Sequence, residues 1–487
     1  METSEPAKRE RYQEVVKALM KLVEEIEEIE EGDLKGLEQK IYQGAFELGR
    51  KLMQGRLNQG KEVEKAPGKI VGACGHEQHL VGYRPRQLLT VLGKVELKRA
   101  YYQCQVEAGT EQEQEEQCSH GAAPADALWG VHGQRTTPGV QMFISYLGAR
   151  LTLEEAAETF SRLLPLGMSG RQTLNLLEPV GKALAAQEDE LVKVLFEQAT
   201  QKASSEQEQA ERLTTQTLER MYIELDGILA RLRRGSVPME EKEQKRKGDV
   251  YREIKVGAVF RGERGRERSE LAPDVWVDTP QAGSMRYVAR RTAKGGFGPL
   301  LYCLALQCGL REAKQVVVLG DGAPWIWKLV CEQFPGAVQI VDLYHAQQHV
   351  WEVAHAVFGH SSPQATSWAP QACRLLVHGQ VEELVMAIAA LPKIPPEPNE
   401  SRSVPEKAVD YFTTNAQRMR YPAFRAQGMH VGSGIVEAAC KTVVSTRAKR
   451  AGMRWTPEGL DAVLALRTSV LNATYDEFWE EQPCLVA

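Results

Sequence analysis

The chain has 487 residues, of which 43% are hydrophobic and 26% charged, and its formal net charge is −5. This length allows two to four domains, and so small a net charge does not by itself point to nucleic acid. No apolar run approaches the roughly 18 residues of a membrane span. The N-terminus METSEPAKRERYQEVV lacks the apolar core of a signal peptide. We therefore expect a soluble cytosolic protein with no membrane partner.

The cysteines favour a reducing environment. Nine of them, an odd number, are scattered over the chain, whereas a disulfide framework is usually dense and evenly paired. Four lie inside apolar segments, where we expect buried thiols: Cys303, Cys308, Cys331 and Cys440.

Residues 1–62 are predicted to be helical. Apolar residues recur there at three- and four-residue spacing, and seven acids fall between Glu24 and Asp33. A solvated amphipathic helix explains both features, and self-association through the apolar stripe is the alternative. The stripe consists of Val16, Leu19, Leu22, Val23, Ile26 and Ile29.

Residues 63–130 look like a zinc ribbon that has lost parts. Tetrahedral zinc needs four nitrogen or sulfur ligands, usually from paired C-x2-C knuckles, and Val71 and Glu107 stand where second cysteines would complete the pairs. One interpretation is a zinc site; the other is a ribbon that no longer binds metal. The candidate ligands are Cys74, Cys104, Cys118 and His120.

Residues 131–215 are predicted to be helical again. The order LTLEEAAETFSRLL, PLGMSG, RQTLNLLEPVGKALA is typical of helix, turn and helix. Thr152 with Glu155 forms a capping-box pattern, and Ser169 is placed to begin a helix that could enter a major groove. A plain helical hairpin would show the same pattern. The polar segment QKASSEQEQAERLTTQ then marks a domain boundary.

Residues 216–350 alternate strands and helices. MYIEL, REIKVGAVFRGER and SMRYVARR predict three sequential antiparallel strands, and the apolar helix PLLYCLALQCGL follows. QVVVLGD then predicts a strand buried on both faces, with a helix from Trp325 to Phe334 and a strand from Ala337 to Val341 after it. The order β-β-β-α-β-α-β is the topology of a ribonuclease-H-like domain.

Residues 351–425 are predicted to be an α-helical insertion, and residues 426–487 the last part of the sheet domain. In the latter, Gly432-Ser433-Gly434 begins a helix expected from Ile435 to Ala451, with Gly452 as its stop. Eight Lys or Arg and a single acid, Glu437, fall between Asn415 and Trp455. Such a segment suits a phosphate-rich ligand that approaches a metal-holding carboxylate.

Three acids stand out by position: Asp226 on the first strand, Asp321 after the fourth, and Glu437 at the start of the late helix. Each has a simpler explanation as a turn former or helix cap. If the first and fourth strands are neighbours, however, the acids face one another, and clustered carboxylates repel unless a cation lies between them. Mg²⁺ suits carboxylate oxygens, and two such ions about 4 Å apart support phosphodiester cleavage or transfer.

Four blocks of the sequence resemble the DDE transposases of bacterial insertion sequences, and within them the Kra-type group. They are LDG at Asp226, GDGAPWIW at Asp321, DLYHAQQH at 342–349, and GSGIVEAACKTVVSTRAKRAGMRW around Glu437. The resemblance spans roughly residues 65–475. It implies that Asp226, Asp321 and Glu437 are a catalytic triad that binds Mg²⁺, with Mn²⁺ as substitute, and that a helical insertion precedes Glu437.

The resemblance also implies a DNA-binding role for the D-x-x-H signature formed by Asp342 and His345. A structural hydrogen bond is the expected role of His349. Trp325 is either a packing residue or a platform for an unpaired base. The residues expected to contact DNA are His345, Asp342, Trp325, Lys441, Arg447, Lys449, Arg450 and Arg454.

The sequence thus predicts a ribonuclease-H-like α/β catalytic domain with a helical insertion, behind a degenerate ribbon and a helical DNA-binding region. The leading hypothesis is a transposase that binds terminal inverted repeats of double-stranded DNA, as a homodimer or larger assembly near the bacterial nucleoid. A nuclease or an inactive DNA-binding derivative is the second hypothesis. A helical interaction protein whose acids merely cap helices is the third.

Overall fold

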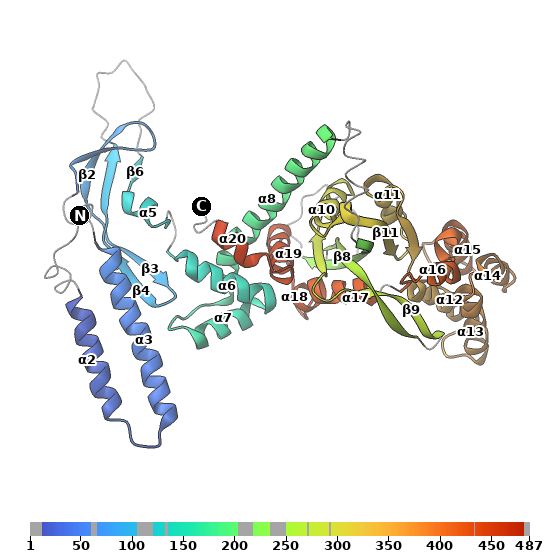
Figure 1. Ribbon diagram of the computed structural model, residues 1–487, viewed down its shortest axis with the longest axis horizontal. Helices are drawn as coiled ribbons and strands as arrows, with labels where there is room; N and C mark the ends of the chain where they lie inside the picture. The colour runs from blue at the N-terminus through green and yellow to red at the C-terminus, as the bar shows by residue number, and fades with distance from the viewer. Residues whose placement is uncertain are drawn as a thin grey trace, which may run out of the picture. The chain divides into compact units, whose positions relative to one another are not determined.

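A computed structural model of the chain describes residues 12–59, 66–104, 120–131, 135–202, 218–233, 250–269, 272–291, 294–432 and 434–481 (Figure 1). The chain divides into two compact units, residues 1–180 with 476–487, and residues 181–475. The division falls within a helix, α8 (Gly170–Lys202), whereas most of the polar segment predicted as a boundary lies outside the described residues. None of the described helices combines the length and the apolar character that a membrane crossing requires.

The first unit begins with two helices, α2 (Gln13–Glu27) and α3 (Leu34–Leu57). A small antiparallel sheet follows in the order β1-β2-β5-β6, and a separate hairpin, β3 with β4, packs on the end of α3. The strands are β1 (Lys69–Val71), β2 (Glu77–Tyr83), β3 (Arg86–Thr90), β4 (Gly93–Leu97), β5 (Ala100–Cys104) and β6 (Gly121–Ala122).

The rest of this unit is helical, with α5 (Pro124–Leu128), α6 (Pro138–Arg150), α7 (Leu153–Leu163) and the first part of α8. The predicted capping box is present, because Thr152 and Glu155 each accept the other's backbone N–H. Ser169 also precedes α8 and accepts the Gln172 N–H at 3.3 Å. The helical prediction for this segment is therefore confirmed at its caps.

The second unit is built on a mixed sheet in the order β10-β8-β7-β11-β12. The strands are β7 (Leu218–Leu232), β8 (Val250–Ser269), β10 (Arg286–Arg290), β11 (Ala313–Gly320) and β12 (Val338–Val341). β7, β11 and β12 pair in parallel, and β8 pairs antiparallel with β7 and β10. Helices α10 (Lys294–Gln307) and α11 (Pro324–Gln333), with a short 3₁₀ turn at Leu310–Glu312, connect the last strands.

One strand of this unit was not predicted. β9 (Ala272–Pro280) pairs only with β8, beyond the central sheet, so four strands rather than three precede α10. Its core DVWVD lies between Pro273 and Pro280, and proline within a strand is found mainly on edge strands. β9 extends β8 into a long two-stranded arm.

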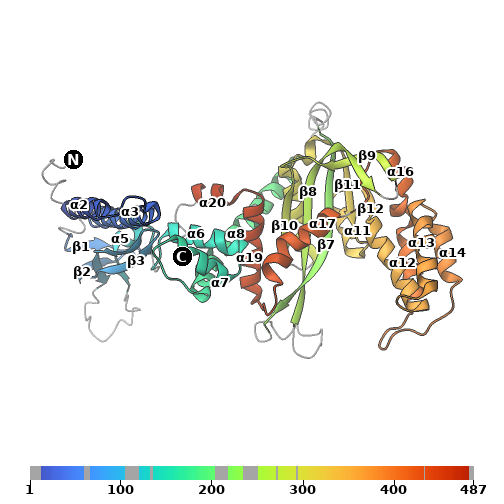
Figure 2. The same ribbon diagram turned by 90° about the horizontal axis from the view of Figure 1, so that it is seen from below.

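The helices of the insertion gather beyond the β12 edge of the sheet (Figure 2). They are α12 (Leu343–Phe358), α13 (Pro363–Val377), α14 (Val381–Ala389), α15 (Val404–Asn415), a 3₁₀ turn (Ala416–Met419) and α16 (Tyr421–Ala426). Both ends of this segment meet, because the N–H of Leu343 donates to the carbonyl of Val431 at 3.0 Å.

The late helix runs without a break from Gly434 to Ala448, close to the predicted Ile435 to Ala451, but its middle is π-helical rather than α-helical. The segment consists of α17 (Gly434–Ala439), a π-helical turn (Cys440–Ser445) and α18 (Thr446–Ala448). Gly452 lies in the turn beyond, at φ +79°. π-helical turns are frequent at functional sites because they reposition side chains within a helix. α19 (Pro457–Leu471) and α20 (Tyr475–Glu481) follow.

Among the described residues, Cys303, Cys308, Cys331, Cys373 and Cys440 form no disulfide. Cys303, Cys308 and Cys440 are buried as predicted, but Cys331 is exposed. It lies on α11, whose other apolar residues pack on the sheet, so an apolar neighbourhood in sequence did not ensure burial.

Candidate active site

The three acids singled out from the sequence line one pocket of about 230 Å³ in the second unit. Asp226 comes from β7, Asp321 from the end of β11 and Glu437 from α17. Asp226 and Asp321 are 95 positions apart in the chain, and Asp321 and Glu437 are 116 apart. The sheet and the late helix therefore bring distant residues together. The lining residues are Leu225, Asp226, Asp321, Asp342, Tyr344, His345, Gln348, Gly434, Val436 and Glu437.

The register of the sheet sets two of the acids side by side. β7 and β11 are parallel neighbours in which Leu225 is paired with Gly320, and Asp226 and Asp321 are the next residue on each. Neighbouring strands lie about 4.8 Å apart, so the acids are adjacent at the end of the β11 strand. This is where ligands bind in open α/β sheets.

Asp226 is held by two donors. One carboxylate oxygen accepts the backbone N–H of Gly227 at 2.6 Å, and the other accepts the thiol of Cys440 at 3.3 Å. Burial raises the pKa of Asp226, and the neighbouring charge of Asp321 raises it further, against the two hydrogen bonds. Burial also raises the pKa of the Cys440 thiol far above its ordinary range, so the thiol keeps its proton and donates.

Asp321 lies in a turn tied to the helical insertion. Its carboxylate accepts the N–H of Ala323 at 2.8 Å, and its backbone carbonyl accepts the hydroxyl of Tyr411, on α15, at 2.9 Å. Gly322 has φ +96°, and a Cβ there would lie 2.5 Å from the Tyr411 ring. Both the turn and the close approach of the tyrosine therefore require glycine. Asp321 is a turn former and a pocket residue at once.

Glu437 is exposed on α17, and a residue that sequence reasoning missed positions this helix. Glu224, on β7, is 0% exposed and accepts the backbone N–H of Val436 at 2.8 Å. Its other oxygen, Oε1, has no hydrogen-bond partner among the described residues, and Nε2 of His430 lies 4.0 Å from it. The available signal was the i, i+2 spacing of Glu224 and Asp226, which puts both acids on the same face of one strand.

Burial holds the pKa of Glu224 well above its ordinary value; the Val436 N–H opposes this, and the nearby charge of Asp342 adds to it. A carboxyl group with no exposed surface is costly to ionise without a cationic partner. Glu224 does not line the pocket and instead anchors α17 through its hydrogen bond with Val436.

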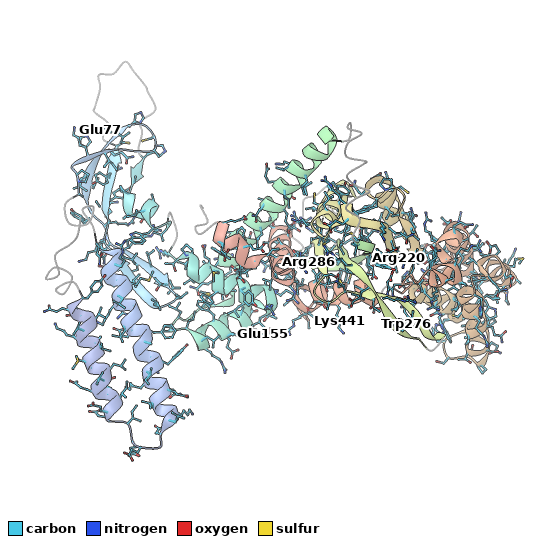
Figure 3. The ribbon with its side chains drawn as sticks, viewed as in Figure 1. Glu77, Glu155, Arg220, Trp276, Arg286 and Lys441 are labelled. Carbon is cyan, nitrogen blue, oxygen red and sulfur yellow. The ribbon has the colours of Figure 1, made fainter. Side chains whose placement is uncertain are left out.

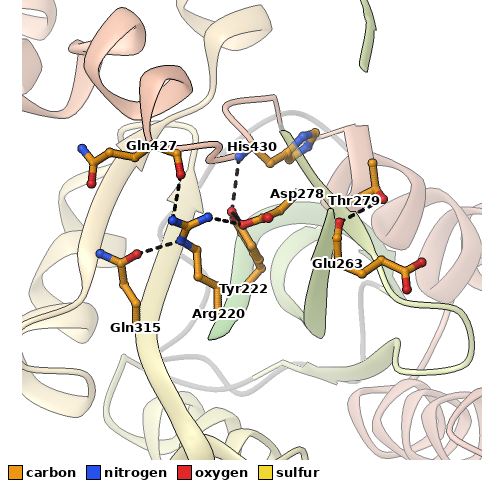
Figure 4. A network of polar contacts seen from close by, with 8 residues as sticks. All are labelled: Arg220, Tyr222, Glu263, Asp278, Thr279, Gln315, Gln427 and His430. Atoms are coloured by element: carbon orange, nitrogen blue, oxygen red, sulfur yellow. Dashed lines mark hydrogen bonds and ion pairs between the residues drawn. The ribbon is translucent and has the colours of Figure 1, made fainter. Parts of the chain in front are cut away.

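A polar network holds the segment that leads into α17 (Figure 4). Arg220 on β7 donates to Asp278 on β9 at 2.8 Å and to the carbonyl of Gln427 at 2.7 Å. Tyr222 donates to the same Asp278 oxygen at 2.6 Å and accepts the N–H of His430 at 3.3 Å. The β9 arm and the exit of the insertion are thereby fastened to the central strand.

Asp342 and His345 both line the pocket, but their roles differ. Asp342 is 2% exposed, and its carboxylate caps α12 by accepting the backbone N–H of His345. The expected direct contact between Asp342 and DNA thus gives way to a structural role. The His345 ring lies 4.8 Å from that of His349, and His349 contacts Glu352 at 2.8 Å, a hydrogen bond of the kind predicted for it.

No protein-family model and no curated protein matches the chain. Among solved structures, the chain is similar to the Drosophila P element transposase strand transfer complex, at 10% sequence identity over 73% of this chain and 83% of that one. The TM-score of 0.23 is too low for a shared fold. The function proposed below therefore rests on the residues and geometry of this chain alone.

Trp325 is not among the residues that line the pocket. It makes an edge contact with Phe297 at 6.4 Å, and the Lys255 ammonium lies 4.7 Å above its ring. These contacts favour packing over base stacking.

The basic residues around the late helix fall into two classes. Lys441, labelled in Figure 3, is exposed, as are Lys449, Arg450 and Arg454. Arg447 is only 1% exposed, and its guanidinium lies 5.0 Å from the centre of the Trp455 ring. The burial of Arg447 favours a structural role over the predicted contact with DNA.

The candidate zinc ligands lie in the first unit and are only partly assembled. Cys74 and Cys104 have their sulfur atoms 3.5 Å apart, and ligand atoms of these two and His76 all lie within 4.8 Å of one another. No other group of three potential ligands in the described part of the chain is as close. Cys118 lies outside the described residues, and the His120 carbonyl, not its ring, accepts the Cys104 N–H at 3.0 Å.

Proposed function

We propose that the chain is a DNA transposase that cleaves and joins DNA strands with Asp226, Asp321 and Glu437, in a domain of ribonuclease-H-like type. The observation that carries the proposal is their shared pocket, built at the end of a mixed sheet from three elements distant in sequence. Exposed basic residues of the segment that follows Glu437 suit a phosphate backbone. The order of strands around β7 is the support for the domain type.

The donors in the pocket fit Mg²⁺ or Mn²⁺. All three acids supply hard oxygen ligands, which these cations prefer. Burial raises the pKa of Asp226, and the like charge of Asp321 raises it further, an effect that a bound cation would offset. Their oxygens are not within 4.8 Å of one another as a group, which leaves room between them. A bound divalent ion would polarise phosphate and lower the pKa of an attacking water or 3′-hydroxyl.

The protein's own contribution is to hold these groups in place. The hydrogen bonds from Gly227 and Cys440 fix the rotamer of Asp226, and Tyr411 with the Gly322 turn fixes Asp321. Glu224 sets the start of α17 and so the reach of Glu437. Catalysis of phosphoryl transfer depends mostly on such positioning and on electrostatic stabilisation. Lys441, Lys449, Arg450 and Arg454 would hold the backbone of double-stranded DNA.

Recognition of the element's terminal inverted repeats is assigned to the first unit, with α6, α7, the first part of α8 and the small sheet. The cysteine pair with His76 offers soft ligands that fit Zn²⁺ rather than Mg²⁺. A zinc ion there would hold the loop that contains Cys74 against β5. Assembly as a homodimer or larger complex on paired DNA ends belongs to the same proposal.

The test uses the full chain and labelled duplexes taken from the ends of the DNA segment that encodes it. Asp226→Asn, Asp321→Asn and Glu437→Gln should each reduce Mg²⁺-dependent cleavage and joining to background while DNA binding persists. Glu332→Gln, an exposed acid of α11 that does not line the pocket, is the matched control and should keep activity. Full activity in any of the three variants would refute the assignment.

The alternative function is a nuclease, or an inactive DNA-binding derivative. Cleavage without joining of the 3′-hydroxyl ends to a target plasmid would favour the nuclease. Binding without cleavage in the unsubstituted chain would favour the derivative.

A further inference from the structure

The two N-terminal helices form a hairpin that buries little of its apolar surface. α2 and α3 run side by side in opposite directions (Figures 1 and 2). Leu22 packs on Gly44, where a Cβ would lie 2.4 Å from the leucine methyl carbons. Despite this contact, no residue of α2 is buried, and α3 has only one buried residue, Leu57 at its end.

One face of the hairpin is a charged groove of about 430 Å³. Its charges are satisfied locally: Lys40 reaches across from α3 to Glu25 at 3.2 Å, and Lys21 reaches the same acid at 3.6 Å. Ion pairs of this kind are compatible with water and need no further partner. The groove is lined by Glu14, Lys17, Ala18, Lys21, Leu22, Glu25, Lys40, Gln43, Gly44, Glu47, Leu48 and Lys51.

The opposite face of α2 is apolar. Successive residues of a helix turn by about 100°, and Lys21 and Glu25 lie on the groove side of Leu22. Leu19 and Val23 therefore lie on the other side, one turn apart, with Val16 one turn further. These three side chains are exposed by 46%, 41% and 57%.

The same reasoning applies to α3, and its apolar residues lie on the same face. Gln43 and Lys40 lie on the groove side of Gly44, so Ile41 lies on the other side, with Leu34 and Leu52 on the same stripe at seven and eleven residues. These three are exposed by 66% for Leu34 and 46% for both Ile41 and Leu52. Together with the α2 stripe they form what we call the apolar face: Val16, Leu19, Val23, Leu34, Ile41 and Leu52.

The apolar face is large enough for a specific interface. Helices of 15 and 24 residues are about 22 and 36 Å long, and two side by side are about 20 Å wide. Their footprint is therefore on the order of 600 Å², close to the roughly 800 Å² that each partner contributes to a standard interface. Contiguous apolar patches of several hundred Å² on soluble proteins mark interaction sites.

We propose that the apolar face binds the same face of a second copy of this chain, in antiparallel orientation, to form a four-helix bundle. A two-helix hairpin with one apolar face is half of such a bundle, and a two-fold axis makes the surface its own complement. The proposal does not depend on whether the chain cuts DNA.

The charges at the two ends of the hairpin specify the orientation. The end at which α2 meets α3 carries the acids Glu27, Glu28, Glu30, Glu31 and Asp33. The far end of α3 carries Arg50, Lys51 and Arg56 against the single acid Glu47, which pairs with Arg50 and Lys51 and leaves that end with a net positive charge. A two-fold axis perpendicular to the helices places the acidic end of one copy against the basic end of the other. An axis along the helices would place acid against acid, which is unfavourable.

The first test is the mass of the full chain in solution, in the absence of DNA, by sedimentation or light scattering. A dimer of the 54.3 kDa chain is expected at micromolar concentration. Ile41→Glu and, separately, Leu19→Glu should raise the dissociation constant by about tenfold or more, because each places a charge in the centre of the interface. The matched control is Gln43→Glu, two residues from Ile41 but on the groove face, which should leave the dimer intact. Circular dichroism checks that each variant is folded.

The second test addresses orientation at low ionic strength. Glu27→Lys and Arg56→Glu should each weaken the dimer, and the double variant should recover it, since the two ends then attract again with reversed sign. A monomeric unsubstituted chain, or equal effects of Ile41→Glu and Gln43→Glu, would overturn the proposal. A tighter dimer for Glu27→Lys alone would overturn the antiparallel arrangement, because it is the result expected when acidic ends meet.

Discussion

Glu224 accepts the backbone N–H of Val436 at 2.8 Å, and Val436 precedes Glu437. A carboxyl group with no exposed surface on the central strand thus sets the position of the helix that carries the third acid of the pocket. The contact joins residues 212 positions apart. Glu224 lies two residues before Asp226 on β7.

Glu224→Leu should lower both stability and Mg²⁺- or Mn²⁺-dependent cleavage, because a buried N–H without an acceptor costs about 1–3 kcal/mol and frees α17 to shift. Glu224→Gln keeps a carbonyl oxygen for Val436 and should retain most activity. Thermal unfolding and the metal concentration at half-maximal cleavage measure the two effects. An unchanged metal requirement in the leucine variant would argue that Glu224 does not position Glu437.

Tyr411→Phe should destabilise the Asp321 turn, since it removes the hydroxyl that donates to the Asp321 carbonyl; a hydrogen bond of this kind contributes about 0.5–1.5 kcal/mol. The matched control is Tyr421→Phe. The Tyr421 hydroxyl is buried and has no hydrogen-bond partner in the described structure, so its removal should be neutral or stabilising. Urea unfolding and cleavage rates are measured for both variants. Equal losses of stability in Tyr411→Phe and Tyr421→Phe would contradict the stabilising role of the Tyr411 hydrogen bond.

The free energy of unfolding should decrease as the pH falls below 6.5, and His349 should cause part of this decrease. Burial, and then the charge of His345, lower the pKa of His349 from its ordinary 6.5. The unfolded chain therefore binds a proton that the folded chain resists, so the loss of stability begins as the pH falls below 6.5 and is complete below the folded pKa. His349→Gln should flatten this dependence between pH 7.5 and 5, as measured by the melting temperature. A parallel pH profile for the variant would count against it.

The cysteine cluster of the first unit should bind one zinc ion per chain, detectable by elemental analysis of the purified protein. Cys74→Ser and Cys104→Ser should each lose it, because both sulfur atoms belong to the same close group, whereas Cys331→Ser, at an exposed thiol on α11, should not. Chelation should destabilise the first unit specifically. A chain purified without zinc, and unable to take it up, would favour the ribbon that no longer binds metal.

Arg447→Met should lower the melting temperature with little effect on intrinsic DNA affinity, because the side chain is buried against Trp455. Arg450→Ala should lower the affinity for DNA with little effect on the melting temperature. An exposed phosphate contact contributes to binding and to its salt dependence, so its loss should reduce the slope of log affinity against log salt by about 1. Filter binding at several salt concentrations gives the slope. A reduced slope for Arg447→Met at temperatures where it is folded would place Arg447 on the DNA.

Much of the site was predictable because its acids follow strong local signals. The run Val316 to Leu319 is uninterrupted and apolar, which predicts a strand buried on both faces, and Asp321 follows it directly. Asp226 follows the strand run MYIEL, which Glu224 interrupts, and lies inside β7 rather than at its end. Its convergence with Asp321 follows from the parallel register, in which Leu225 is paired with Gly320.

The features that were not predicted depend on tertiary contacts. Glu224 occupies a strand interior, where an acid usually marks an exposed face, and its burial depends on α17 packing over β7. The π-helical turn has no composition that separates it from an α-helix, yet it lies just before the buried Arg447. β9 is an edge strand that pairs only with β8, and the prolines Pro273 and Pro280 within it obscure its strand pattern. The local sequence pattern predicts most strands, whereas long-range packing determines which polar side chains are buried and where a helix changes its register.

The hydrogen bond between Leu343 and Val431 has a consequence for how such a chain can change over time. The intervening 87 residues leave and re-enter the sheet domain at a single point. Insertions, deletions or replacement of this segment can therefore occur without displacing the strands of the sheet. The number of residues between Asp321 and Glu437 is then a poor guide to whether two chains are related. The residues at the positions of Leu343 and Val431 are the better reference points for aligning distant chains.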